Sequence, residues 1–346
     1  MKILVVAPSW IGDTVLAQPL FKLLRARHPE LVLDVIAPPW TLPVLRRMPE
    51  IRRAGAHNFM HGKLQLADRC ATGRALAREH YDQAIILPNT LKSVLAPLFA
   101  RIRTRTGYRG ESRWLVLNDM RQLDEQALPQ IAQRYAALGL PAATQLPSPL
   151  PLPRLAIDHA ARLQTLAQLG LDHAGEAIAF CPGAEYGPAK RWPAPYFAEL
   201  ARKLAAEGRP VWLIGSGNDA PVGEEIARLA PDACIDLCGR TTLDQATDLL
   251  ASARLVVTND TGLMHVAAAV GTPLLALYGS STPAFTPPMS AAATIMKLDI
   301  PCSPCFERTC PLGHFDCMNR LKPELVYDRL RAVLAPASAD TATVTG

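Results

Sequence analysis

Two acidic residues each follow an apolar run at the point where a helix should begin, and both could do chemistry. Asp13 lies in PSWIGDTV, directly after KILVVA (2–7), and Asp260 lies in TNDTGLMHVAAA (258–269), after another apolar run. A carboxylate in such a turn can take a proton from a hydroxyl group as a general base, or bind hydroxyls by hydrogen bonds. Aspartate is also a preferred helix N-cap residue, which gives Asp13 a purely structural alternative. The spacing leaves both roles of Asp13 open.

Two loops have the composition of anion-binding sites. In CPGAEYGPAKRWP (181–193), glycines and prolines follow a strand-like run and lead to Lys190. In TNDTGLMH, the amides that begin with Thr261 should open a helix, whose N-terminus favours negative charge. Asp260 beside them would repel a phosphate and suits sugar hydroxyls better. His265, one turn further on, fits a buried core position as well as a ligand contact, and an ordinary basic loop is the alternative for 181–193.

Four cysteines near the C-terminal end have the spacing C-x2-C-x4-C-x6-C. They are Cys302, Cys305, Cys310 and Cys317, with His314 among them. Four thiolates are the ligand set of a structural zinc site or of an iron–sulfur cluster. The alternative is a Cys-rich loop that binds no metal. The segment lies outside the strand–helix repeats, so we expect its role to be structural.

Positive charge is concentrated in the first half of the chain. Residues 1–155 hold 21 Lys+Arg against 11 Asp+Glu, whereas residues 156–346 hold 15 against 20. Five of the arginines lie in RIRTRTGYRGESR (101–113), which we interpret as a basic loop. This charge favours an anionic partner such as nucleic acid, a phosphorylated compound or an anionic membrane surface. No nucleic-acid-binding module surrounds the arginines, so a phosphorylated acceptor fits better, with a solvated basic surface as the alternative.

A rival interpretation comes from LIGSGNDA (213–220), which contains G-x-G-x-x-A after a strand. Asp236 follows in the next predicted strand, as in a dinucleotide-binding fingerprint. The pattern keeps a nicotinamide-dependent oxidoreductase open. That function would leave PSWIGD, the Lys190 loop and TNDTGLMH without a role.

Alternating strands and helices should position these motifs. We predict strands at 2–7, 31–38, 81–88, 177–183, 210–217, 234–239, 255–260 and 273–279. We predict helices from the first turn to about residue 26, before residue 81, and at 196–208, 222–230, 242–253 and 262–270. This alternation is typical of an α/β fold with parallel sheets, in which ligands bind beyond the carboxyl ends of the strands.

Length and composition agree with two such domains. The 346 residues exceed a usual single domain, and 49% hydrophobic with 19% charged residues exclude a wholly disordered chain. PAATQLPSPLPLPRL (141–155) holds five prolines and should form the linker between the domains. Residues 335–346 are small and polar, and we expect them to be disordered. No apolar run reaches the roughly 18–20 residues that span a bilayer, and the N-terminus lacks the features of a signal peptide, so we expect a cytoplasmic protein.

Several of these motifs occur together in one known family. MKILVVAPSWIGDTVLAQPL, RMPE, LPNTLKS, RTGYRGE, CPGAEYGPAKRWP and VTNDTGLMHVAAA run in order from residue 1 to about 285. In these motifs the chain resembles the bacterial ADP-heptose glycosyltransferases of lipopolysaccharide assembly, although the Cys-rich segment is not part of every member. The resemblance implies a GT-B fold: two Rossmann-like domains facing across a cleft, with residues 1–150 binding the acceptor and 151–334 the donor.

The resemblance also implies an inverting transfer that requires no metal. The donor would be ADP-L-glycero-β-D-manno-heptose, and PSWIGD is typical of members that act on the first heptose of the inner core, on Kdo2–lipid A. Members acting on another core acceptor remain an alternative, as does a non-catalytic nucleotide-sugar-binding module. The implied partners are ADP-heptose and a lipid A-linked Kdo–heptose acceptor, with peripheral contact at the cytoplasmic face of the inner membrane and no nucleic acid. No two acidic residues are spaced D-x-D, so Lys190 and helix dipoles would neutralise the diphosphate.

Residue by residue, the resemblance assigns Asp13 as the general base and Lys190 as the lysine beside the donor diphosphate. Asp260 would contact the heptose hydroxyls. The acid that binds the ribose is left open between Asp219 and Glu224. The whole donor set is Gly183, Gly187, Lys190, Asp219, Glu224, Thr241, Thr242, Asp260, Thr261, Gly262 and His265, with Thr241 at the adenine edge. The acceptor set is Gly12, Lys92, Arg105 and Arg109.

Overall fold

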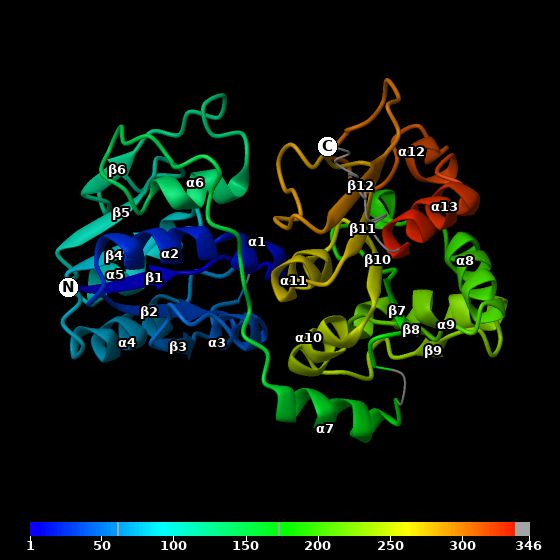
Figure 1. Cartoon of the computed structure of the whole chain (residues 1–346). Helices are drawn as coiled ribbons and strands as arrows, with labels where there is room; N and C mark the ends of the chain where they lie inside the picture. Colours follow the sequence, from blue (N-terminus) through cyan, green and yellow to red (C-terminus); the bar gives the residue numbers. More distant parts are fainter. Residues whose placement is uncertain (61, 172–173, 336–346) are drawn as a thin grey trace, which may run out of the picture.

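Two parallel six-stranded sheets form the framework of the computed structural model, which describes residues 1–60, 62–171 and 174–335 (Figure 1). The strands of the first sheet are β1 (Lys2–Val6), β2 (Val32–Ala37), β3 (Arg53–Ala56), β4 (Gln83–Ile86), β5 (Thr104–Tyr108) and β6 (Asp119–Arg121). Those of the second are β7 (Ile178–Cys181), β8 (Val211–Leu213), β9 (Ile235–Asp236), β10 (Leu255–Asn259), β11 (Leu274–Tyr278) and β12 (Ala293–Lys297). The predicted α/β architecture is confirmed.

Both sheets have the same strand order. The first runs β3-β2-β1-β4-β5-β6, and the second runs β12-β11-β10-β7-β8-β9, which is the same order seen from the other end. In such a sheet the order of successive strands reverses direction between two neighbouring strands. Ligands bind beyond the carboxyl ends of this strand pair. That pair is β1 and β4 in the first sheet, and β7 and β10 in the second.

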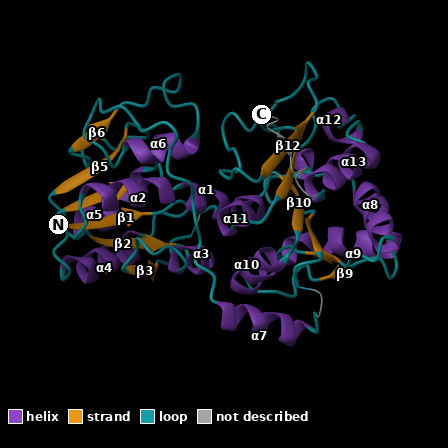
Figure 2. Cartoon of the chain, in the orientation of Figure 1, coloured by secondary structure: helices purple, strands orange, loops and turns teal. Residues whose placement is uncertain are grey.

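Helices surround each sheet (Figure 2). In the first unit they are α1 (Ile11–Leu16), α2 (Gln18–Arg27), α3 (Leu42–Arg46), α4 (Leu66–Ala77), α5 (Leu91–Phe99) and α6 (Ile131–Ala137). In the second they are α7 (His159–Leu169), α8 (Ala194–Ala206), α9 (Ala220–Leu229), α10 (Leu243–Ser252), α11 (Gly262–Val270), α12 (Asp316–Asn319) and α13 (Pro323–Leu334). Single 3-10 turns form η1 (Pro39–Thr41), η2 (Pro188–Lys190) and η3 (Gly217–Asp219).

The buried strands show why these sequences form sheets covered on both faces. Along β1, Ile3 and Val5 pack into one apolar cluster with α2, whereas Leu4 and Val6 pack into another with α4 and α5. Successive side chains of a strand point to opposite faces, so a continuous apolar run suits a strand between two helical layers. The first of these clusters continues into the second unit through residues of α10 and α11, so the two units share one core.

The structure corrects several predicted elements. Residues 104–108, which we interpreted as part of a basic loop, form β5. Strands β3, β6 and β12 were not predicted, because their short sequences RAGA, DMR and ATIMK are half-exposed and have no apolar run. Residues 141–157 form neither helix nor strand, as the prolines predict. Apart from Ala335, the predicted disordered tail lies outside the described residues.

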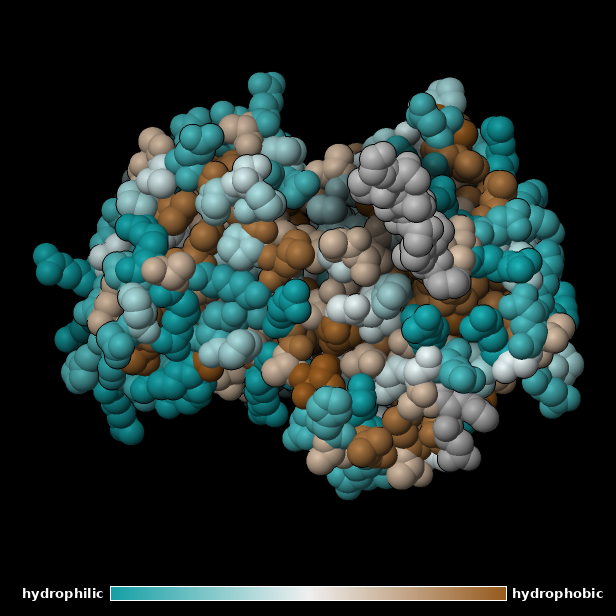
Figure 3. All heavy atoms as spheres, in the orientation of Figure 1, coloured by the Kyte–Doolittle hydropathy of each residue, from teal (hydrophilic) through white to brown (hydrophobic). Residues whose placement is uncertain are grey.

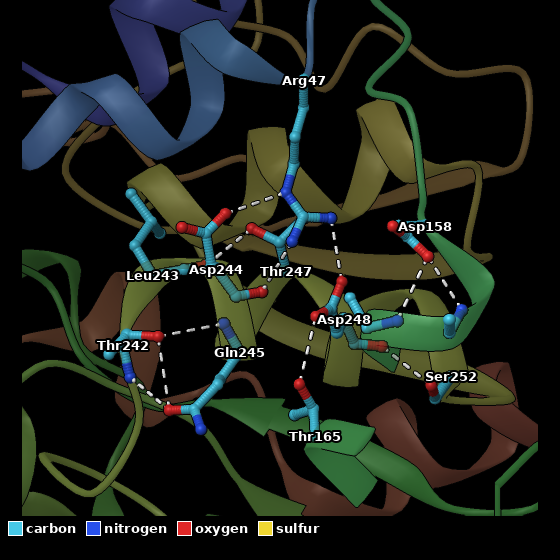
Figure 4. Close-up of polar contacts among 12 residues, drawn as sticks. Arg47, Asp158, Thr165, Thr242, Leu243, Asp244, Gln245, Thr247, Asp248 and Ser252 are labelled. Carbon is cyan, nitrogen blue, oxygen red and sulfur yellow. Dashed lines mark hydrogen bonds and ion pairs between the residues drawn. The ribbon is translucent and has the colours of Figure 1, made fainter. Parts of the chain in front are cut away.

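The units are also joined by a polar contact at the end of α3 (Figure 4). The guanidinium of Arg47 donates to Asp244 Oδ1 at 3.1 Å and to Asp248 Oδ1 at 2.8 Å, both on α10. Thr165 of α7 donates to the other oxygen of Asp248 at 3.2 Å. The carboxylate of Asp248 is only 3% exposed, so its charge depends on these partners. Among the described residues, none of the helices is long and apolar enough to cross a membrane.

Replacing Arg47 should therefore destabilise the protein. In Arg47→Ala the buried carboxylate of Asp248 keeps only the Thr165 hydroxyl, and we expect the free energy of unfolding to fall by about 3 kcal/mol. Urea denaturation followed by circular dichroism would measure the loss. The neighbouring exposed Arg46→Ala is the matched control and should change stability little. Equal stability of the two variants would contradict a role for the ion pair.

Candidate active site

An ion pair between a partly buried lysine and a buried aspartate lies at the carboxyl ends of β7 and β10. Lys190 in η2 donates from Nζ to Asp260 Oδ2 at 2.5 Å, and Ser281 Oγ donates to the same oxygen at 2.5 Å. Asp260 lies between β10 and α11 and is 5% exposed. The structure thus brings together two residues that are 70 positions apart, at the turning point of the second sheet.

Asp13 of the first unit lies within electrostatic reach of this pair. Burial raises the pKa of its carboxyl to about 6; the Lys190 cation opposes the rise and the Asp260 anion adds to it. Asp13 is the third residue of α1, at the turning point of the first sheet, and Trp10 is the N-cap. The helix-cap alternative is therefore wrong, because the chain enters the helix three residues before Asp13. A carboxylate with this pKa is ionised near neutral pH and is a stronger base than an exposed aspartate.

Two glycines let α1 and α11 meet closely enough to form this site. A Cβ atom on Gly12 would lie 2.7 Å from His265 Cδ2, and one on Gly262 would lie 3.0 Å from the Cβ of Ile11. His265 is 4% exposed, its Nδ1 has no hydrogen-bond partner among the described residues, and burial lowers its pKa to about 4. It is therefore a neutral ring between Gly12 and the Lys190–Asp260 pair. Thr261 caps α11 in an extended conformation, so the first amides of this helix lack intrahelical partners.

The Cys-rich segment supports the Lys190 loop through its main chain. The carbonyl of Arg308 accepts the N–H of Ala189 at 3.0 Å, and the carbonyl of Phe306 accepts the hydroxyl of Tyr186 at 2.6 Å. A Cβ on Gly187 would lie 2.4 Å from the Arg308 oxygen, so only glycine permits this contact. Lys190 Nζ also lies 5.1 Å from the centre of the Tyr186 ring. The segment thereby fixes the position of the ammonium group.

The structure does not assemble the metal site predicted at Cys302, Cys305, Cys310 and Cys317. In the ranges 1–60, 62–171 and 174–335, no three His, Cys, Asp or Glu side chains are arranged to hold a metal ion. The four cysteines are free and half-buried. Cys310 instead accepts the backbone N–H of Phe315 at 3.4 Å, a bond within the loop. Close spacing in sequence brought the thiols into one loop but does not fix the directions of their side chains.

The other predicted donor residues lie on the second unit in different environments. Gly183 packs directly on the buried carboxylate of Asp219, whose Oδ2 accepts from Ser216 and whose Oδ1 has no described partner. Glu224 is exposed on α9. Thr241 has a buried hydroxyl without a described partner, whereas the hydroxyl of Thr242 caps α10 by accepting from Gln245. Asp219 thus has a carboxylate oxygen without a described hydrogen-bond partner, next to the Gly183 backbone. Glu224 is exposed and does not lie against this glycine.

The predicted acceptor residues are not all brought together. Gly12 is at the site, and Lys92 is half-exposed in the first turn of α5, beyond the end of β4. Arg109 is exposed just beyond β5. Arg105 lies on β5 and donates to the carbonyls of Val116 and Ile102 at 2.7 and 2.6 Å. Its guanidinium therefore stabilises the main chain around β5.

Sequence reasoning missed three residues at the site. Ser281, after β11, shares Asp260 with Lys190, and Tyr186 lies beside the Lys190 ammonium. Tyr135 of α6 is buried near Asp13, and both burial and that carboxyl raise its pKa well above 10. Tyr186 lay inside a motif already singled out; Ser281 and Tyr135 follow no pattern that marks them in the sequence.

Comparison with known proteins gives one consistent result. Residues 69–316 match the family model described as glycosyltransferase family 9 (heptosyltransferase). Lipopolysaccharide heptosyltransferase 2 of Escherichia coli K12 is 43% identical over 348 residues, covering 98% of this chain and all of the relative. Lipooligosaccharide heptosyltransferase 2 of Haemophilus influenzae is 45% identical over 311 residues, covering 86% of this chain and 89% of the relative.

A solved structure agrees with these sequence matches. The structure of E. coli ADP-heptose LPS heptosyltransferase II superposes with a TM-score of 0.87 at 43% identity, covering 96% of this chain and 98% of that one. The predicted GT-B fold is thus confirmed, and the oxidoreductase interpretation is wrong. In its G-x-G-x-x-A turn, the Asp219 carboxylate accepts the N–H and the hydroxyl of Ser216.

Proposed function

The chain belongs to glycosyltransferase family 9, the heptosyltransferases, and from this premise we propose that it transfers heptose from ADP-L-glycero-β-D-manno-heptose to the first heptose of the lipopolysaccharide inner core. The transfer inverts the anomeric configuration and needs no metal ion. One observation carries the proposal: Asp13 of the first unit faces the Lys190–Asp260 pair of the second. A base and a fixed cation on opposite units suit the transfer of a group between two bound substrates.

In the proposed reaction Asp13 takes the proton of the acceptor hydroxyl. The oxygen attacks the anomeric carbon of the donor while the bond from that carbon to the diphosphate breaks, and the electron pair leaves with ADP. Lys190 faces the negative charge that develops on the departing diphosphate. An ammonium group has three N–H donors, so Lys190 can keep its bond to Asp260 while it binds a phosphate oxygen. Asp260 in turn accepts from heptose hydroxyls.

We propose that residues 1–150 bind the acceptor and residues 151–334 bind the donor. The charge distribution supports this assignment, since the first half of the chain is basic and the acceptor carries Kdo carboxylates and lipid A phosphates. Donor-site candidates lie on the second unit around Lys190, Asp260 and the N-terminus of α11. Such an acceptor places the enzyme at the cytoplasmic face of the inner membrane.

Charge neutralisation by the protein supports the metal-independent mechanism. The sequence has no D-x-D pair, and the donor phosphates would instead meet the Lys190 cation and the N-terminal amides of α11. Asp219, with an unpartnered oxygen beside Gly183, is the better candidate than Glu224 to bind the ribose.

A transfer assay with two acceptors tests the proposed function. We expect transfer from ADP-heptose to mono-heptosylated Kdo2–lipid A, in the presence of EDTA, and no transfer to bare Kdo2–lipid A. Turnover of the bare acceptor alone would assign the chain to a different step of core assembly. Dependence of the rate on an added divalent ion would overturn the metal-independent mechanism.

Lys190→Ala should slow the transfer strongly. A fixed cation stabilises the leaving diphosphate more in the transition state than in the ground state, and its loss typically costs about 10²–10³ in kcat. Turnover at saturating donor measures the effect. Lys203→Ala, which removes a half-exposed lysine of α8 that pairs with Glu199 and Glu324, is the control and should leave kcat unchanged. A kcat of Lys190→Ala within a few-fold of the wild type would exclude this role.

Asp13→Asn should remove turnover while the fold and ADP binding persist. We expect kcat to fall by about 10²–10⁴, and the wild-type rate to decline as the pH drops below about 6, where the carboxyl is protonated. The pKa of the Asp13 carboxyl is higher in the folded protein than in the unfolded chain, so protonation of Asp13 favours the folded state. This contribution to stability is lost as the pH rises through the folded-state pKa of about 6. The melting temperature of Asp13→Asn should therefore equal or exceed that of the wild type above this pH. Asp68→Asn, in the first turn of α4, is the control; an active Asp13→Asn enzyme would remove the base.

A further inference from the structure

One tyrosine differs from the others in what its hydroxyl contacts. Six of the seven tyrosines donate a hydrogen bond to a protein oxygen: Tyr81, Tyr108, Tyr186, Tyr196, Tyr278 and Tyr327. The hydroxyl of Tyr135, on α6, makes no hydrogen bond to any residue in the described ranges, although the side chain is only 7% exposed. A buried phenol without a partner is unfavourable. Its hydroxyl therefore has to find a partner outside the chain, in water or in a bound ligand.

Helix packing places Tyr135 beside the proposed base. Leu16 of α1 packs in one apolar cluster with Ala132 and Ala136 of α6. Residues three apart share a face of a helix, so Asp13 lies on the same side of α1 as Leu16. Tyr135 likewise lies on the same side of α6 as Ala132. Burial and the nearby Asp13 carboxyl both raise the pKa of the phenol, which is therefore a neutral hydrogen-bond donor near neutral pH.

Contacts with both units hold α6, and thus Tyr135, in place. The N–H of Ile131, the first residue of α6, donates to the carbonyl of Phe285 in the second unit at 3.1 Å. The guanidinium of Arg134 lies 5.0 Å from the centre of the Phe285 ring. The hydroxyl of Tyr108, on β5, donates to the carbonyl of Arg134 at 2.7 Å. A hydroxyl on a helix fixed in this way is suited to orient a substrate.

The charges around the phenol indicate what it would bind. The Asp13 carboxyl beside it would repel an anionic group. The nearby Arg134 cation already donates to Glu125 Oε1 at 3.3 Å and to the carbonyl of Leu128 at 2.9 Å. A neutral donor next to a carboxylate therefore suits a sugar hydroxyl better than a carboxylate or a phosphate. In the proposed acceptor, the heptose is the part that offers such hydroxyls beside the reacting one.

We infer that the Tyr135 hydroxyl donates a hydrogen bond to the heptose hydroxyl that adjoins the attacking one, and thereby orients the attacking hydroxyl toward Asp13. The inference rests on the proposed function, because it requires a heptose as the acceptor. A hydrogen bond donated to the attacking oxygen itself would withdraw electron density from it and slow the attack. The adjoining hydroxyl is therefore the suitable contact, and Tyr135 determines acceptor specificity while Asp13 takes the proton.

Tyr135→Phe tests the inference with a deacylated, water-soluble acceptor. The change removes the hydroxyl and keeps the ring, so we expect kcat/KM for the acceptor to fall by about tenfold or more, with KM for ADP-heptose unchanged. The melting temperature should not fall, because the hydroxyl has no protein partner to lose. Tyr108→Phe is the matched control: it removes a hydroxyl that bonds to the same helix, so it should lower the melting temperature and leave kcat/KM unchanged.

Acceptor analogues that each lack one hydroxyl beside the attacked one identify the contact. On one of them, the wild type and Tyr135→Phe should have equal kcat/KM. Equal values on the complete acceptor, or a loss that persists on every analogue, would overturn the inference. It would also be overturned if the pH at which kcat falls differed between the two proteins, because the phenol would then act on Asp13 and not on the sugar.

Direct binding separates this inference from the proposed function. Absence of transfer by the wild type would count against the proposed function alone. Calorimetric titration of the deacylated acceptor would then still test Tyr135, since weaker binding by Tyr135→Phe than by Tyr108→Phe supports the contact. Equal binding by the two variants would overturn it.

Discussion

The close contact between α1 and α11 is the constraint on which the rest of the site depends. Gly12 and Gly262 allow the two helices to meet at their N-terminal ends, and that contact buries the Asp13 carboxyl beside the Lys190–Asp260 pair. Two carboxylates and one ammonium group in a poorly hydrated space are unfavourable unless the second negative charge is also stabilised by hydrogen bonds or a cation. Ser281 donates to Asp260, and the Lys190 cation favours the ionised form of Asp13.

The identical strand order of the two sheets explains how distant residues meet. Each sheet presents a turning point at its carboxyl edge, and these edges face one another across α1 and α11 (Figure 1). The space-filling surface is notched between the two units on the side away from α7 (Figure 3). The candidate site residues lie in loops at these turning points, and the buried sheets behind the loops hold them in place. The Arg47 contact with α10, next to Thr165 of α7, also joins the units (Figure 4).

Much of this arrangement could be predicted, and the remainder was missed for physical reasons. Buried strands such as β1 and β10 are recognisable in the sequence because both faces are apolar. Asp13, Lys190 and Asp260 were proposed as site residues because each follows such a strand, and the structure brings the three close together. The edge strands β3, β6 and β12 have no such signal. The pairing of Lys190 with Asp260, and the place of Ser281, depend on how loops 70 and 21 residues apart converge in space. The hydrogen bonds of Arg105 to the carbonyls of Val116 and Ile102 could not be predicted either, because a basic composition does not reveal where a guanidinium points.

The surroundings of Asp13 set its strength as the proposed base. Burial is the main cause of the raised pKa of its carboxyl, while the Lys190 cation of the second unit lowers that pKa and the Asp260 anion raises it. A carboxylate is a better proton acceptor when its pKa is higher, as long as it stays ionised near neutral pH. The same surroundings therefore serve the proposed chemistry twice, because burial raises the proton affinity of Asp13 and the Lys190 cation beside it keeps that pKa from rising further.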